Sequence, residues 1–347
     1  MQQHFKKRYE NGAISLLRFS QFLSHSIRAT KKWLAYREGK SSYYLTVGKF
    51  SDRSIEELKR IYNAEPNSRL QNQIKHLANS ESIRKRSKRS LEQTIPAPSS
   101  KQSFIDRIVK SVQSIGARKD IVHVDWRNSG CLQEPVDQYE CGCCYAMASV
   151  KLFEWLHCQE QHGQLVKFSE QYILDCGKLV GLKGCESGSI GKTLEFVEAH
   201  GMMLNERLPY KGEQQTCPLE DEPDKLAISS QLIFTERLSE KVLRLDEWAE
   251  KLSRQPLLVY MYVADDFFDF ADGYYDNENC DRSFGHFVVL VGHGVENNRE
   301  YWLFSNSYGK DWGSGGYFKL LKSKDSCIGY VLQTDAKFKQ QNLHKKF

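Results

Sequence analysis

This 347-residue sequence lacks several features, and each absence excludes a class of protein. No window approaches the roughly 18 consecutive apolar residues that a membrane-spanning helix needs, and the apolar run at residues 287–291 is typical of a buried strand. Residues 1–9 are polar and basic, where a secretory signal has an apolar core of about 7 to 15 residues. No Asn-x-Ser/Thr glycan acceptor occurs. We therefore expect no membrane partner, and no export signal within the chain as written.

Cysteine is absent from the first third of the chain, because all ten cysteines lie between Cys131 and Cys327. No Cys-x2-Cys pair meets a second such pair at the spacing of a zinc finger, so we expect no metal and no cofactor. The hydrophobic content of 40%, with 12% aromatic residues, is that of a globular protein that buries a core. The length suffices for about two domains.

Charge divides the chain in the same way. Residues 1–120 hold 25 Lys and Arg against 10 Asp and Glu, and the remainder holds 24 against 34. A basic arm of this kind is compatible with nucleic-acid binding, but no recognisable nucleic-acid module with interleaved aromatic residues is present. Docking of the basic segment on the acidic remainder of the same chain is at least as natural. We expect no nucleic-acid partner.

The N-terminal region has the pattern of a small helical module. Residues 13–37 have the apolar spacing of an amphipathic helix, and residues 43–47 are typical of a short strand. Ser54 and Glu57 form a capping box that opens a second helix, which we expect to end near Tyr62. A basic run at 84–89 and a Pro/Ser-rich stretch at 94–103 then mark an exposed linker. The basic run is a processing site, a nuclear localisation patch or a solvated surface.

The pattern becomes strand-rich after about residue 225. Turn residues separate four expected strands, at residues 257–263, 284–291, 301–305 and 317–321. Helices followed by strands predict an α+β fold and not an alternating βαβ one.

Cys144 is the strongest candidate for a chemical role. It precedes the apolar stretch 146–156, which predicts a buried helix with this cysteine in its first turn. Unpaired N–H groups and the helix dipole at such a position favour the thiolate. The alternatives are half of a disulfide or a small buried side chain.

A nucleophilic thiol also needs a base and a group that orients it. His286 at the start of a buried strand and Asn306 after the next strand fit those needs, 142 and 162 residues downstream.

These residues resemble those of the papain-like cysteine peptidases. The family signature Cys-Gly-Ser/Ala-Cys-Trp/Tyr is matched by residues 141–145 with Cys143 at the third position. The runs 124–127 (Val-Asp-Trp-Arg), 184–188 (Gly-Cys-Glu-Ser-Gly) and 306–309 (Asn-Ser-Tyr-Gly) also resemble the family, as do Trp312-Gly313 and Gly316-Tyr317. The resemblance covers residues from about 120 to 335. It implies a two-lobed fold, with a helical lobe at about 120–225 that carries the nucleophile helix and an antiparallel, β-barrel-like lobe at about 226–335.

The resemblance also implies a role for each matched residue. Cys144 is the expected nucleophile, His286 the base and then the acid, and Asn306 the group that orients His286, while Gln138 helps to bind the oxyanion. The expected substrate-binding residues are Gly188, Ser189, Ile190, Phe287, Leu332 and Tyr308. Phe287 follows the catalytic His, where a small residue is more usual, so we expect a shortened pocket that prefers small aliphatic side chains.

Four disulfides are implied in the same way. Three follow the family framework, Cys141–Cys185, Cys176–Cys217 and Cys280–Cys327. The fourth, Cys131–Cys158, is similar to an additional bridge in cathepsin B. Cys144 is then a free nucleophile, and Cys143 has no assigned role.

The N-terminal module resembles the inhibitory propeptide of this family. Residues 48–57 are similar to its Asn-x-Phe-x-Asp-x-x-x-x-Glu-Glu segment, with Gly48 in place of Asn. The expected organisation is a helical propeptide at 1–82, a linker at 83–119 and a peptidase domain at 120–347, with cleavage after Arg89 or near 114–120. Acidification is expected to weaken docking by protonating carboxylates.

The sequence therefore predicts the zymogen of a cysteine endopeptidase. Its expected partners are peptide or protein substrates, its own propeptide and cystatin-type inhibitors, and we expect a lysosomal or extracellular monomer. Tyr145 and Tyr308 stand where the family usually has Trp, and Ser187 stands where it has Gly. These departures keep open the alternative of a weak or inactive papain-like protein that acts in binding or storage.

Overall fold

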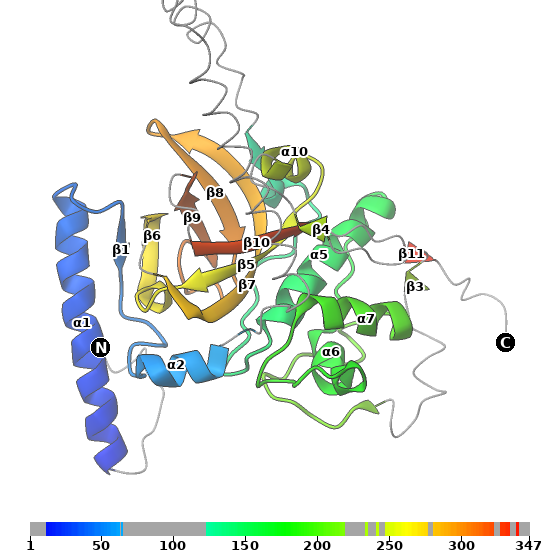
Figure 1. The fold of residues 1–347 in the computed structure, drawn as a ribbon, viewed down its shortest axis with the longest axis horizontal. Helices are drawn as coiled ribbons and strands as arrows, with labels where there is room; N and C mark the ends of the chain where they lie inside the picture. Colours follow the sequence, from blue (N-terminus) through cyan, green and yellow to red (C-terminus); the bar gives the residue numbers. More distant parts are fainter. Residues whose placement is uncertain are drawn as a thin grey trace, which may run out of the picture. The chain divides into compact units, whose positions relative to one another are not determined.

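The computed structural model describes residues 12–62, 64, 123–218, 233–234, 241–242, 247–276, 280–322, 327–333 and 338–339 (Figure 1). The predicted linker and both predicted cleavage regions lie outside these residues. Among the helices in the described ranges, none is long and apolar enough to cross a membrane.

The N-terminal segment forms two helices and a short strand, close to the predicted positions. These are α1 (Gly12–Arg37), β1 (Tyr43–Leu45) and α2 (Ile55–Tyr62). Ser54 caps α2, because its hydroxyl accepts a hydrogen bond from the Glu57 backbone N–H at 3.2 Å. The Glu57 carboxylate instead bonds the Arg18 guanidinium of α1. The glutamate of the capping box therefore ties the two helices together.

The helical part of the peptidase region surrounds a long buried helix. It contains β2 (Val124–Asp125), η1 (Trp126–Asn128), α5 (Cys144–Glu160), α6 (Glu170–Cys176), η2 (Gly177–Val180) and α7 (Ile190–His200). Every residue of α5 from Cys144 to Cys158 is buried, as expected for a helix that is covered on all sides. Ser169 and Ser189 cap α6 and α7 with their hydroxyl groups.

The second part of the peptidase region is dominated by strands. Its described elements are β3 (Ile233–Phe234), β4 (Lys241–Val242), α10 (Trp248–Leu252), β5 (Leu257–Val263), η4 (Phe267–Asp269), β6 (Phe270–Tyr275), β7 (Asp281–Glu296), β8 (Arg299–Ser305), β9 (Tyr317–Leu321), β10 (Ile328–Gln333) and β11 (Phe338–Lys339). All four predicted strands are present, and the α+β class is confirmed. Strand β7 is longer than predicted because Gly292 and Gly294 continue it instead of ending it. Gly292 lies so close to β2 that a Cβ there would approach the Val124 carbonyl oxygen to 2.5 Å.

The sheet differs in detail from the antiparallel, barrel-like lobe that we predicted. In the described strands its order is β1-β6-β9-β8-β7-β5-β10-β4, an open path and not a closed barrel. Strands β6 and β9 pair in parallel, while the other neighbours are antiparallel. Its edge strand β1 comes from the N-terminal segment and pairs with β6. The N-terminal segment thus extends the sheet of the peptidase region.

Candidate active site

Cys144 is the first residue of α5, and its side chain is fully buried. The backbone N–H of Phe287 in β7 bonds its sulfur. Phe287 directly follows His286, so the predicted nucleophile and the predicted base meet where α5 packs on β7.

His286 and Asn306 form a buried pair. The distance from His286 Nε2 to Asn306 Oδ1 is 2.7 Å, and Oδ1 also accepts the backbone N–H of Ser307 at 2.8 Å. Because an amide oxygen only accepts, Nε2 must carry the proton. In the neutral ring Nδ1 is then an acceptor, and this buried atom has no hydrogen-bond partner. Asn306 therefore sets the tautomer that a general base needs.

Tyr308 covers this pair from one side. Its ring stacks on the His286 ring with centroids 4.8 Å apart, and Trp312 meets the Tyr308 ring edge-on at 5.5 Å. Tyr308 is 1% exposed. The ring that replaces the usual Trp therefore excludes water from the imidazole. Its hydroxyl oxygen is buried without a hydrogen-bond partner.

Burial keeps both reactive groups neutral in this state. It raises the pKa of the Cys144 thiol to about 12, although backbone N–H groups that bond the sulfur lower it. Burial also lowers the pKa of the His286 imidazole to about 4, against the opposing effect of the Asn306 hydrogen bond. The helix-terminus argument alone favoured a thiolate, and desolvation outweighs it here. Nor is there a hydrogen bond from the thiol to Nδ1 of His286.

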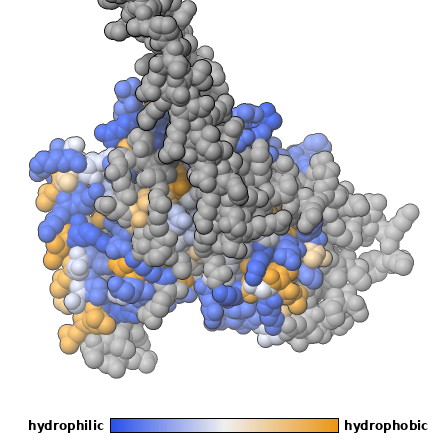
Figure 2. Space-filling model, viewed as in Figure 1, coloured by the Kyte–Doolittle hydropathy of each residue, from blue (hydrophilic) through white to orange (hydrophobic). Residues whose placement is uncertain are grey.

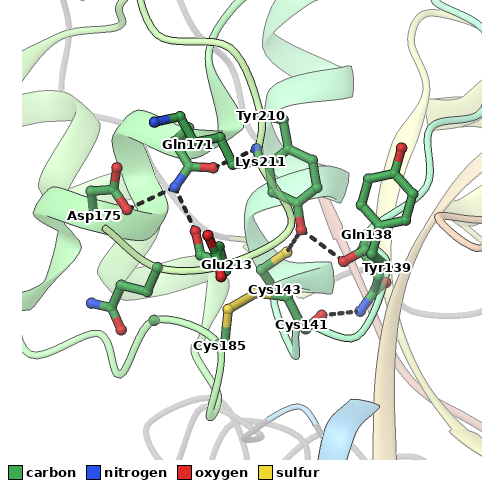
Figure 3. The surroundings of a disulfide bond; sticks show 12 residues. Gln138, Tyr139, Cys141, Cys143, Gln171, Asp175, Cys185, Tyr210, Lys211 and Glu213 are labelled. Carbon is green, nitrogen blue, oxygen red and sulfur yellow. Dashed lines mark hydrogen bonds between the residues drawn. A yellow bond between two sulfur atoms is a disulfide. The ribbon is translucent and has the colours of Figure 1, made fainter. Parts of the chain in front are cut away.

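Gln138 is fully buried beside this centre and is held on several sides (Figure 3). Its Nε2 donates to the Cys141 carbonyl at 2.8 Å, and its Oε1 accepts the Ser307 hydroxyl at 2.5 Å. One N–H of the amide is therefore used within the protein. The second N–H of the same group remains as a donor.

Cys143, which the sequence left without a role, bonds away from the nucleophile. Its sulfur lies 3.1 Å from the Tyr210 hydroxyl, which donates to the Gln138 carbonyl oxygen at 2.7 Å. Figure 3 shows this hydroxyl between Cys143 and Gln138. Tyr210 was missed from the sequence, because it lies 67 residues from Cys143 and no local pattern marks it.

Tyr145, the aromatic residue that follows Cys144, fits its buried surroundings. The Tyr145 hydroxyl donates to the Gly184 carbonyl at 3.1 Å, so the group that distinguishes Tyr from Trp finds a partner. A Cβ on Gly188 would approach the Tyr145 ring to 2.5 Å. Gly188 is thus needed for this close packing.

The predicted substrate-binding residues have different surroundings. Ser189 serves as the cap of α7, Ile190 is 1% exposed and Leu332 lies in β10 opposite Leu258. Phe287 packs against the Tyr260 ring at 5.1 Å. Tyr260 was missed from the sequence, and it also stacks on Tyr330 at 5.0 Å. The space under Gly285 is occupied by the Tyr260 hydroxyl, which would lie 1.9 Å from a Cβ there.

The N-terminal segment runs over this centre. The Ala64 N–H donates to the Gly285 carbonyl at 2.9 Å, next to His286. On the other side, a Cβ on Gly142 would lie 2.7 Å from the Ile61 carbonyl oxygen. The Tyr62 hydroxyl donates to the Tyr139 carbonyl at 2.6 Å. The segment therefore contacts both the helical part and the strand part, directly beside the buried thiol.

Four disulfides join the described cysteines: Cys131–Cys158, Cys141–Cys185, Cys176–Cys217 and Cys280–Cys327. The free cysteines are Cys143 and Cys144. The Cys141–Cys185 bridge holds the loop before α5, where the Gly142 N–H also donates to the Cys185 carbonyl at 2.8 Å. This set of bridges is typical of proteins from an oxidising compartment.

Comparison with known proteins agrees with this geometry. Residues 122–335 match the family described as papain family cysteine protease. A cathepsin L-like proteinase of Phaedon cochleariae is 24% identical over 330 residues, which cover 94% of this chain and 89% of that protein. A pro-cathepsin H of Medicago truncatula is 29% identical over 207 residues, which cover 58% of this chain and 57% of that protein. The solved structure of digestive procathepsin L 3 of Tenebrio molitor larval midgut has a TM-score of 0.71 at 21% identity and covers 96% of this chain and 95% of its own.

Proposed function

The chain belongs to the papain family of cysteine proteases, and from that premise we propose that it is the zymogen of an endopeptidase with Cys144 as its nucleophile. It is a cysteine-type peptidase of α+β papain fold. The observation that carries the proposal is the buried hydrogen bond from His286 to Asn306, adjoining the Phe287 N–H that bonds the Cys144 sulfur.

The chemistry follows from these positions. Once the site opens, Nδ1 of His286 takes the Cys144 proton, and the thiolate attacks the peptide carbonyl. The spare N–H of Gln138 and the Cys144 backbone N–H stabilise the oxyanion, by roughly 2.7–4 kcal/mol for each donor in comparable enzymes. The amine leaves with the proton from His286, and water then hydrolyses the thioester. Asn306 holds the ring in place throughout.

Residues 1–82 are proposed as the inhibitory propeptide, 83–119 as the linker that is cleaved and 120–347 as the peptidase domain. The contacts of Ile61, Tyr62 and Ala64 beside Cys144 support an intramolecular inhibitor. Inhibition by this segment is then both steric and electrostatic. It blocks access, and by excluding water it keeps the thiol and the imidazole neutral.

For specificity, we propose a preference for a small aliphatic side chain at the second substrate residue before the cleaved bond. Tyr260 fills the space under Gly285 and its ring packs against Phe287. The residue of the N-terminal segment that bonds Gly285 is an alanine, Ala64. The disulfides support an oxidising compartment, which we propose to be lysosomal or extracellular. The proposed substrates are peptides and proteins, and cystatin-type inhibitors are proposed as further partners.

The experiment is labelling of the acid-activated protein with a peptidyl epoxide, with Cys144→Ala and Cys143→Ala as a matched pair. We expect label on the wild type and on Cys143→Ala, and none on Cys144→Ala. Label that survives in Cys144→Ala and disappears in Cys143→Ala would refute the nucleophile assignment. A correctly processed wild type without any label would favour the binding or storage alternative.

Peptides that differ only at the second residue before the cleaved bond test the pocket. If the peptide with a bulky side chain at that position is cleaved fastest, the proposed preference for small aliphatic side chains is wrong.

A further inference from the structure

Helix α1 carries most of the large apolar side chains that the described residues expose. Eight of the thirteen such side chains lie on this one helix. Figure 2 shows apolar side chains along the outer edge of the molecule where α1 lies, interspersed with hydrophilic ones. A concentration of this kind marks an interaction surface more often than chance exposure does.

Six of these eight side chains lie on one side of α1, whereas Leu17 and Tyr36 lie elsewhere around the helix. At about 100° per residue, Leu16, Leu23, Ile27 and Leu34 fall within roughly 20° of a single line along the helix. Their exposures are 73%, 44%, 56% and 48%. The opposite side holds His25 and Ala29, which are buried against the rest of the chain at 4% and 6% exposure. The apolar line therefore faces away from the protein.

Further exposed apolar side chains widen this line into a face. Phe19 and Trp33, at 57% and 41% exposure, lie about 60° and 100° to one side of it. We call Leu16, Phe19, Leu23, Ile27, Trp33 and Leu34 the outer face of α1. The six side chains span about 120° around the helix, an arc that a flat apolar boundary can cover.

The charges of α1 indicate which kind of partner the outer face binds. The helix contains five Lys and Arg residues and no Asp or Glu. Arg18 and Arg28 point inward to Glu57 and Asp269, and Lys32 lies over the Tyr43 ring. Lys31 is exposed beside the outer face, and the exposed Arg37 lies over the Trp33 ring within that face. A second copy of the chain would bring like charges together, whereas an anionic surface neutralises them.

We propose that the outer face of α1 docks on anionic lipid bilayers. A cationic helix with Trp, Phe and Leu on its other side lies in the plane of such a surface, with its apolar side chains among the headgroups. The sequence led us to expect no membrane partner, because no segment is long enough to span one. That argument excludes a span and does not address a helix that lies on the surface. Since α1 belongs to the proposed propeptide, cleavage would end the attachment. The docking itself does not depend on the chemistry of Cys144.

The test is flotation of the full chain with vesicles, using Cys144→Ala as the background so that the chain stays unprocessed. We expect binding to phosphatidylcholine vesicles that contain about one-third phosphatidylserine, weak binding to phosphatidylcholine alone, and release by high salt. The double variant Leu23→Gln, Ile27→Gln should lower the partition coefficient at least about tenfold. It keeps every charge of the chain, so attraction by other basic segments is the same in both proteins.

The matched control makes the same two changes elsewhere. Leu165 and Leu179 are exposed to a similar extent, 42% and 51%, and Leu165→Gln, Leu179→Gln should leave the partition unchanged. Equal binding by the α1 double variant, equal binding to neutral vesicles, or no binding at low salt overturns the proposal. If the parent chain forms a dimer without lipid and the double variant is a monomer, the outer face binds a second copy of the chain. A lower melting temperature of the double variant without lipid would assign it to another part of the same chain.

Discussion

Two of the contacts between the N-terminal segment and the peptidase region differ in chemistry. The polar contact gathers His25, Arg28 and Ser51 around the buried carboxylate of Asp269. The aromatic contact is a cluster of Phe50, Tyr62, Phe268 and Tyr308, whose ring centroids lie 5.1–5.8 Å apart.

The two contacts also differ in their distance from the chemistry. Tyr308 stacks on His286, so the aromatic contact reaches the reactive centre directly. Asp269 acts at a distance from it, by fixing α1 and the turn that carries Ser51. Aromatic packing depends little on pH or salt, whereas ionic hydrogen bonds depend on both. We infer that the aromatic contact closes the site and that the polar contact decides under which conditions it opens.

The largest effect is expected from Phe50→Ala. This side chain is 4% exposed and meets Tyr62, Phe268 and Tyr308, so its loss should cost about 3–5 kcal/mol. The open state should become at least about a hundredfold more populated. The measurement is the rate of iodoacetamide labelling of Cys144 in the unprocessed chain at neutral pH.

Phe19→Ala is the matched control, because Phe19 is 57% exposed on the outer face of α1. It should leave the labelling rate unchanged. If Phe50→Ala also left it unchanged, the aromatic contact would not be what covers the thiol.

Asp269→Asn should have a smaller effect. The Asp269 carboxylate is 1% exposed and bonds His25 and Ser51 at 2.7 and 2.9 Å, and it also bonds Arg28. Asn keeps the shape but loses the charge. Since the Arg28 side chain is 32% exposed and can turn to water, we expect a loss of about 1–3 kcal/mol and not the full cost of breaking a buried pair.

The measurement for Asp269→Asn is the melting temperature of the unprocessed Cys144→Ala chain at low and high salt. The variant should melt lower, and salt should affect it less than the parent. Asp272→Asn, a change at an exposed position of β6, is the control. If salt changes the melting temperature of parent and variant equally, the salt-sensitive contacts of the N-terminal segment do not involve Asp269.

Sequence reasoning succeeded where the signal is local. The capping residue Ser54, the apolar run of β5 and the start of α5 at Cys144 are each determined by neighbours within a few positions, and all three were placed correctly. The positions of His286 and Asn306 at neighbouring predicted strands singled them out, and the resemblance to the papain family added a role for each.

What the sequence did not reveal depends on residues that are distant in the chain. Phe50 and Tyr308 meet across 258 positions, and nothing near either residue indicates the other. The same holds for Tyr260, which fills the space under Gly285. The local argument for a thiolate at Cys144 also failed for this state, because desolvation by burial outweighs the helix terminus. Long-range packing decides such features, and one sequence does not encode it in a readable pattern.

The smallest expected effect is a pH-dependent change in melting temperature from the Arg18–Glu57 ion pair, which joins α1 and α2. The hydrogen bond to Arg18 is the main cause that holds the pKa of the Glu57 carboxyl below its usual value. A carboxyl whose folded pKa is lowered contributes stability above its unfolded pKa of about 4.3, and loses that contribution as the pH falls through the folded pKa.

Because the Arg18 and Glu57 side chains are partly exposed, at 18% and 22%, the contribution should be about 0.5–1 kcal/mol. Glu57→Gln should therefore lower the melting temperature of the unprocessed chain by a few degrees at pH 7, and this difference should shrink as the pH falls below about 4.3, because the parent then loses the same interaction. Glu56→Gln, one position earlier on α2 and exposed, serves as the control. A difference between parent and Glu57→Gln that does not shrink as the pH falls below about 4.3 would show that the side chain acts through packing and not through its charge, and that this ion pair is not an acid-sensitive contact of the N-terminal segment.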